Sequence, residues 1–174
     1  MTKINSKFEI RNSKLNKSFT LIELLIFMVI FSVMTIVMTQ IFSSILDAQK
    51  ESESVSNVDQ DANFIISRLS YDLGRTTSIT QPALGSTNAS LQLVISAGNY
   101  TYALSNGNLI LTSPFGTDQL NNFNTTISNL SFQRLGNSGA NSKNTVRFGF
   151  TIISKTVKSS GIESKSYQTT VGIR

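Results

Sequence analysis

Side chains that commonly do chemistry are sparse in this chain, and one carboxylate stands apart from the rest. The sequence holds no histidine and no cysteine, which excludes histidine-dependent triads, cysteine nucleophiles and the usual zinc sites. No clustered pair of acids suggests catalysis, so we expect no enzymatic activity, no metal and no cofactor. Glu23 is different because it is the only charged residue between Phe19 and Leu46. A carboxylate at mid-bilayer depth costs roughly 2.5–3.5 kcal/mol, so we expect Glu23 to have a compensating partner.

The apolar stretch Phe19–Leu46 is long enough to span a bilayer as a helix, for which about 20 residues suffice. The formal net charge of the chain is +5, and most of it precedes this stretch. The charged residues there are Lys3, Lys7, Arg11, Lys14 and Lys17, against Glu9 alone. Basic residues that flank a first apolar helix stay in the cytoplasm. We therefore expect one pass through the bacterial cytoplasmic membrane, with residues 47–174 outside the cytoplasm.

Two ordinary interpretations of this N-terminal segment leave observations unexplained. A cleaved secretory signal has an apolar core of about 7–15 residues and an A-x-A-like site, whereas this stretch is longer and lacks such a site. A plain single-pass anchor explains the basic flank and the apolar run, but it does not explain Glu23.

The segment KSFTLIELLIF, Lys17 to Phe27, resembles the class III signal of type IV pilins and their pseudopilin relatives. That pattern has a short basic leader, a small residue and then a sequence like F-T-L-I-E. The resemblance implies that a membrane-embedded prepilin peptidase removes the leader, residues 1–18, by cutting between Ser18 and Phe19. It also implies that Phe19 becomes the N-methylated N-terminus. The family usually has glycine before the cut, where this chain has Ser18.

The same resemblance gives Glu23 a role, because it occupies the fifth mature position, where the family places its glutamate. In a fibre, Glu23 would pair with the N-terminal amine of an adjoining subunit, which would offset the cost of burying the carboxylate. The implied partners are other pilin or pseudopilin subunits, contacted through the N-terminal helix, together with the prepilin peptidase and the inner-membrane assembly platform. The competing interpretation is a glutamate close enough to the helix start to reach the membrane interface.

Residues 47–74 are predicted to continue the helix as an amphipathic half. No proline or glycine occurs from Phe19 to Leu73. Apolar residues recur at mostly three- or four-residue steps, as on one helix face, at Ala48, Val55, Val58, Ala62, Ile65, Leu69 and Leu73. Gly74 is a stop signal, and Arg75 suits a helix C-terminus.

Residues 90–174 are predicted to be β-rich, because the apolar period changes to two. The predicted strands are LQLVIS, YTYALS, LILTS, ISNLSFQRL, TVRFGFTIIS and SYQTTVGI. Asn106-Gly107-Asn108 reads as a hairpin turn, and loops are expected at 81–90, 112–124, 136–143 and 155–165. The expected fold class is α+β, in which a long N-terminal helical spine packs on an antiparallel sheet in a pilin-like head.

Together these features predict a minor pilin or pseudopilin, a structural subunit of a type IV pilus or a type II secretion pseudopilus. Arg68, Leu69, Asp72 and Leu73 also resemble a stretch in J-type minor pseudopilins and W-type minor pilins; otherwise Arg68 and Asp72 are an ordinary helix pair. The alternatives are a major pilin and an uncleaved, membrane-anchored binding domain.

Two charged sets carry no site prediction. The acids Glu51, Glu53, Asp59 and Asp61 are expected to form a solvated helix face, because calcium needs oxygens that converge. The basic residues of the last strands are expected not to bind nucleic acid, since no aromatic platform lies between them; they are Arg147, Lys155, Lys158 and Lys165.

Overall fold

The computed structural model describes residues 20–137 and 144–173 and places them in one helix and nine strands. The chain divides into two compact units, Met1–Ser43 and Ser44–Arg174, and the helix α1, Leu21–Gly74, has residues in both. The strands are β1 Ser78–Gln81, β2 Thr87–Asn88, β3 Leu91–Ile95, β4 Gly98–Ser105, β5 Asn108–Ser113, β6 Gly116–Gln119, β7 Thr125–Leu135, β8 Thr145–Lys158 and β9 Gly161–Gly172.

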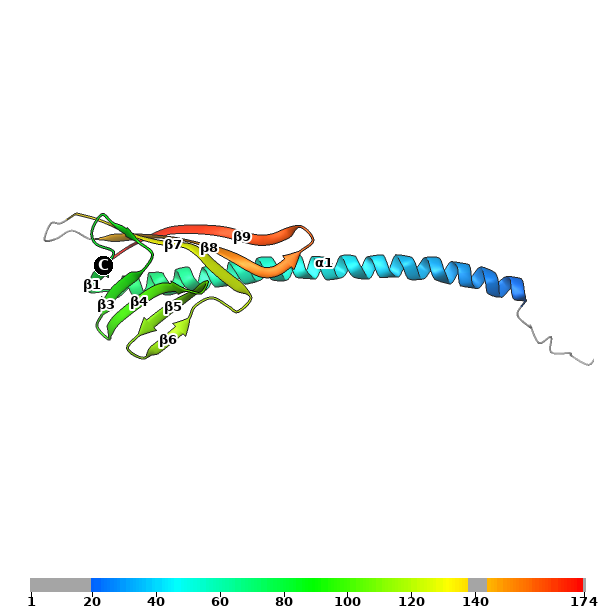
Figure 1. Ribbon diagram of the computed structural model, residues 1–174, viewed down its shortest axis with the longest axis horizontal. Helices are drawn as coiled ribbons and strands as arrows, with labels where there is room; N and C mark the ends of the chain where they lie inside the picture. Colours follow the sequence, from blue (N-terminus) through cyan, green and yellow to red (C-terminus); the bar gives the residue numbers. More distant parts are fainter. Residues whose placement is uncertain (1–19, 138–143, 174) are drawn as a thin grey trace, which may run out of the picture. The chain divides into compact units, whose positions relative to one another are not determined.

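The C-terminal half of α1 supplies one apolar face to the core of the second unit. Its buried residues follow the helical period and are Ser54, Val58, Ala62, Ile65, Leu69, Asp72 and Leu73. The helix ends at Gly74, as predicted. The chain then continues into β1. The strands of the second unit lie beside this half of the helix (Figure 1), and their apolar side chains form one core with it.

Two antiparallel sheets complete the core. The first has the strand order β1-β3-β4-β5-β6, and the second has the order β2-β7-β8-β9. Each contributes alternating apolar side chains, among which Tyr102, Phe132 and Phe148 are the largest fully buried ones. The Ile127 N–H donates to the Gly107 carbonyl at 2.7 Å and so connects β7 to the β4–β5 turn.

The β4–β5 hairpin confirms the predicted turn. Ser105 pairs with Asn108, and the two residues between them have positive φ angles of 50° at Asn106 and 77° at Gly107. A two-residue turn of this hand matches the twist of the flanking strands. Asparagine and glycine are the residues that adopt it at the lowest cost.

A bulge in β7 explains why its apolar alternation is imperfect. The register with β8 shifts between Ser128 and Ser131, and Asn129 within the shift has a φ of 52°. The extra residue lets Ile127, Leu130 and Phe132 all enter the core, although strict alternation would turn one set outward.

Three of the expected loops hold more regular structure than the sequence predicted. The segment 81–90 contains β2, and 112–124 contains β6. The expected loop 155–165 is wrong, because β8 and β9 continue as a ladder to a tight turn at Ser159–Ser160. The strand β1 was also missed. These segments are polar, so backbone pairing formed them without an apolar pattern. The α+β class is confirmed: a long N-terminal helix packs on antiparallel sheets, as in pilins.

Candidate assembly segment

The first turn of α1 contains the candidate site residue Glu23 and a helix cap. Thr20 precedes the helix, and its Oγ1 accepts a hydrogen bond from the Glu23 N–H at 3.4 Å. The Thr20 carbonyl accepts from the N–H groups of Glu23 and Leu24 at 3.1 and 3.2 Å. The spacing Thr-x-x-Glu is that of a capping box. Sequence reasoning missed Thr20, although this spacing was a readable signal for it.

Glu23 also lies where its charge favours the helix. It is the acidic residue of the first turn, where a carboxylate interacts well with the N-terminal end of the helix dipole. Its side chain is exposed, so its predicted partner is not provided by the described part of the chain. The predicted cleavage residues Ser18 and Phe19 lie outside the described residues.

The apolar half of α1 has no cover within the described chain. Large apolar side chains are exposed from Leu21, with 79% of its surface accessible, to Leu46, with 40%. The helix is long and apolar enough to cross a membrane. An exposed apolar surface of this extent is typical of a lipid-facing or protein-facing segment, and the helix therefore fits membrane anchoring.

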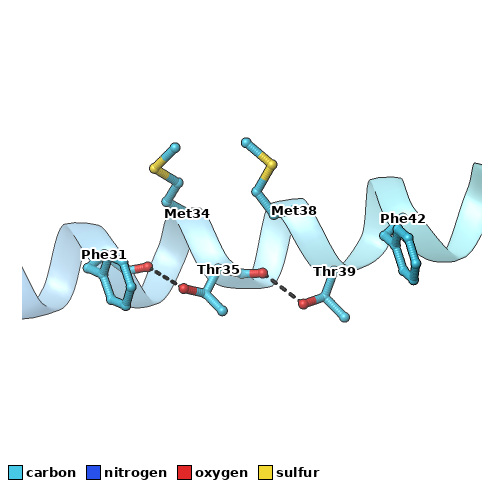
Figure 2. Close-up of a pocket in the computed structure, with 6 residues that line it drawn as sticks. All are labelled: Phe31, Met34, Thr35, Met38, Thr39 and Phe42. Carbon is cyan, nitrogen blue, oxygen red and sulfur yellow. Dashed lines mark hydrogen bonds between the residues drawn. The ribbon is translucent and has the colours of Figure 1, made fainter.

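Two threonine hydroxyls within this half donate hydrogen bonds to the helix backbone. Thr35 Oγ1 donates to the Phe31 carbonyl at 2.9 Å, and Thr39 Oγ1 donates to the Thr35 carbonyl at 2.9 Å (Figure 2). Internal bonds of this kind make hydroxyls tolerable in lipid. These threonines line a shallow groove together with Phe31, Met34, Met38 and Phe42.

In the second unit, Asp72 is a completely buried carboxylate at the end of the core helix. Its Oδ2 accepts from Arg68 Nε at 3.0 Å and from the Tyr102 hydroxyl on β4. Its Oδ1 accepts no hydrogen bond from the described residues and lies 3.7 Å from Arg75 Nη2. The predicted Arg68–Asp72 helix pair is therefore present, but it also connects the helix to the first sheet.

Of the four acids predicted to form a solvated face, Glu53 is exposed, whereas Glu51, Asp59 and Asp61 have partners on the strands. Asp59 accepts from Lys165 Nζ at 2.9 Å and from the Tyr167 hydroxyl at 2.7 Å, both on β9. Asp61 Oδ2 accepts from the Asn122 N–H at 2.9 Å and from the Thr125 hydroxyl. The expectation is therefore incomplete, because the partners of Asp59 and Asp61 come from segments distant in the sequence and connect these segments to the helix.

Glu51 makes a third connection, to the end of the β8–β9 hairpin. Lys158 Nζ lies 2.9 Å from Glu51 and 2.7 Å from Glu163, and Ser160 donates to Glu51 at 3.0 Å. The hydrogen bond from Lys158 lowers the pKa of Glu51, and the bonds to Glu163 and Glu51 raise the pKa of Lys158.

The basic side chains of the last strands are largely occupied. Lys158 and Lys165 pair with carboxylates, and Lys155 Nζ donates to the Phe123 carbonyl at 2.7 Å. Among the described residues, no group of three or more acidic side chains is placed to hold a metal ion.

Alkaline pH is expected to destabilise the second unit through its tyrosines. Burial, together with the hydrogen bond to Asp72, raises the pKa of Tyr102, and burial with the Asp59 bond raises the pKa of Tyr167. Because the pKa of each tyrosine is higher in the folded state than in the unfolded state, unfolding above about pH 10 releases a proton. The free energy of unfolding that each tyrosine contributes is therefore complete below about pH 10 and decreases as the pH rises above it. For Tyr102, which is fully buried, the loss is about 1.4 kcal/mol per pH unit.

The measurement is urea unfolding of the detergent-solubilised protein between about pH 9 and 11. Tyr102→Phe removes one titrating group and should reduce the slope of unfolding free energy against pH. An unchanged slope in Tyr102→Phe would contradict this assignment.

These features define a protein with an apolar N-terminal helix, an acid in the first helical turn and an α+β head. The comparisons with known proteins agree with this class. Residues 13–39 match the family model described as the prokaryotic N-terminal methylation motif. No curated protein and no solved structure matches the chain. The methylation motif supports a type IV pilin-like or pseudopilin protein, a class of structural subunits that are processed by prepilin peptidase and assemble with other pilins.

Proposed function

We propose that this protein is a minor pilin or pseudopilin that enters or primes a type IV pilus or a type II secretion pseudopilus. The observation that supports this most is the exposed apolar half of α1, which has Glu23 in its first turn and begins inside the methylation motif. Such a helix is stable in lipid before assembly and against other apolar helices after it. A major pilin would share these features; abundance in purified fibres distinguishes the two.

The proposed route has three stages. The basic leader, residues 1–18, stays in the cytoplasm while residues 19–46 anchor the chain in the membrane and residues 47–174 lie outside the cytoplasm. Prepilin peptidase cuts between Ser18 and Phe19, and Phe19 is methylated. The inner-membrane assembly platform then moves the subunit into the fibre, where Glu23 pairs with the amine of an adjoining subunit.

The match of Arg68, Leu69, Asp72 and Leu73 to the J-type and W-type stretch fits a structural need in this chain. Leu69 and Leu73 are buried in the core, and Asp72 joins Arg68 to Tyr102. The J-type or W-type proposal thus rests on the resemblance of these four residues, because the same packing would need them in a major pilin as well.

Processing is expected to give a mature chain that begins at methylated Phe19. Intact mass and N-terminal sequencing of the protein extracted from membranes measure it, in cells with and without prepilin peptidase. Ser18→Gly should be cleaved at least as well, and Ser18→Arg, which places a bulky charge before the cut, should not be cleaved. A mature protein that retains Lys17 would favour the uncleaved anchor and contradict the proposal.

A further inference from the structure

The β8–β9 hairpin continues beyond the strand that supports it on its other side (Figure 1). β8 pairs with β7 only as far as Ser154, the partner of Thr125. The Lys155 N–H then donates to the Asn124 carbonyl at 2.8 Å. From residue 156 to residue 163, named here the hairpin tip, β8 and β9 pair only with each other among the described strands. A two-stranded hairpin by itself is marginally stable at best in water, so the tip needs another contact to stay ordered.

A bulge at the base of the tip provides a hinge. The register of the β8–β9 ladder shifts between Ile153 and Val157, and a bulge of this kind disrupts the ladder and bends the strand locally. Beyond the shift, Val157 pairs with Ile162 and Lys158 pairs with Gly161. The paired rungs of the tip are therefore separated from the regular ladder at the point where support from β7 ends.

Apolar burial does not hold the tip to the helix. Its two apolar side chains, Val157 and Ile162, are 69% and 58% exposed. On α1, Ser54 is completely buried, but its Oγ has no hydrogen-bond partner among the described residues. The first apolar residue of the described helix that enters the core is Val58, two turns beyond Glu51. A segment with few buried apolar contacts belongs to the least stable part of a fold.

The polar contacts between the tip and α1 all end on one carboxylate. Lys158 Nζ lies 2.9 Å from Glu51 Oε1, and the Ser160 hydroxyl donates to Glu51 Oε2 at 3.0 Å. Lys158 also lies 2.7 Å from Glu163, which belongs to the tip itself. If the tip moved away from the helix, Lys158 would therefore keep one of its two carboxylate partners. Opening would break only the contacts to Glu51.

We propose that the hairpin tip is a strap that opens and closes against α1 about the bulge, with Glu51 as its latch, while the rest of the second unit stays folded. The inference concerns this unit alone and does not depend on the proposed function. The Glu51 side chain is 48% exposed, so dissolved ions screen its attraction to Lys158. Opening also returns the ammonium group of Lys158, whose side chain is 6% exposed, to water, which offsets part of the lost attraction. The open fraction therefore rises with ionic strength.

Amide hydrogen exchange of the full-length protein in detergent tests the strap without any substitution. We expect the paired amides of the tip to exchange much faster than those of β8 residues 146–152, and with little dependence on dilute urea, because local opening exposes little surface. Salt at about 1 M, where the Debye length is only about 3 Å, should speed exchange of the tip several-fold and leave residues 146–152 unchanged. Equal rates and equal urea dependence in the two segments would overturn the proposal, as would a tip that does not respond to salt.

A pair of matched variants tests the latch. Glu51→Gln keeps the size of the side chain and removes its charge, so it should speed exchange of the tip several-fold at low salt and remove most of the salt effect. Glu53→Gln removes the same charge from an exposed position on the same helix and should leave the tip like the wild type. Wild-type exchange in Glu51→Gln, or equal acceleration in Glu53→Gln, would overturn the role of Glu51 as the latch. Faster exchange of residues 146–152 in Glu51→Gln would overturn the separate opening of the tip.

Discussion

Glu23→Ala is expected to abolish incorporation into fibres while leaving membrane insertion and cleavage intact. Removing a charge from an apolar helix makes insertion equally or more favourable. Cleavage precedes contact with a neighbouring subunit, so it does not depend on the proposed pair. In the assembled state, however, the amine of the adjoining subunit would be buried without its partner. One-sided loss of a buried pair costs about 3–5 kcal/mol, which is large enough to deplete the variant from isolated fibres.

The cap at Thr20 provides the control for this experiment. Glu23 lies at the end of a Thr-x-x-Glu box, so its loss could act through the helix start alone. Thr20→Ala removes the cap, at a cost of about 0.5–2 kcal/mol, and leaves the Glu23 charge in place. Thr20→Ser retains an acceptor oxygen for the Glu23 N–H.

The readout is the ratio of each variant to other pilins in purified fibres, with cleavage and membrane content measured in parallel. Glu23→Gln keeps the size of the side chain, loses its charge and should be depleted like Glu23→Ala. Thr20→Ala should assemble much better than either. Wild-type incorporation of Glu23→Ala would refute the pairing role, and equal depletion of Thr20→Ala would assign the effect to the cap.

Asp72→Ala is expected to destabilise the second unit by about 2–4 kcal/mol, a large part of a typical total stability of about 5–15 kcal/mol. Asp72 is completely buried and accepts from Arg68 and Tyr102. Its loss leaves the buried Tyr102 hydroxyl without the carboxylate that accepts its hydrogen bond. Arg68, whose side chain is 37% exposed, can turn toward water, so it adds less to the cost.

A double-mutant cycle distinguishes the loss of the Asp72–Tyr102 hydrogen bond from a general loss of packing. Tyr102→Phe in the Asp72→Ala background removes the orphaned hydroxyl, so the double variant should be less destabilised than the sum of the single ones. Glu53→Ala, at an exposed acid on the same helix, should change the unfolding free energy little. Additive single effects, measured by urea unfolding, would contradict the proposed coupling between α1 and β4.

The sequence alone determined the parts of this protein that depend on local pattern. The apolar period of α1 and the absence of glycine before Gly74 predicted where the helix ends. Asn106-Gly107 predicted the β4–β5 turn, because few other residue pairs adopt its positive φ angles. The motif around Glu23 predicted the class of protein that the methylation-motif match then supported. Each of these features is encoded within a few consecutive residues.

Only the tertiary structure decided what the polar residues of the second unit do. Asp59 and Lys165, or Glu51 and Lys158, meet across more than a hundred residues of chain. The spacing of the acids along one helix does not identify their partners. The sequence alone therefore could not distinguish acids that pair with the strands from acids that face solvent. The sequence also did not predict the full length of the β8–β9 hairpin, because local spacing does not identify pairing partners. Its last rungs are joined by backbone pairing and by side chains that meet the helix, and neither leaves an apolar period in the sequence.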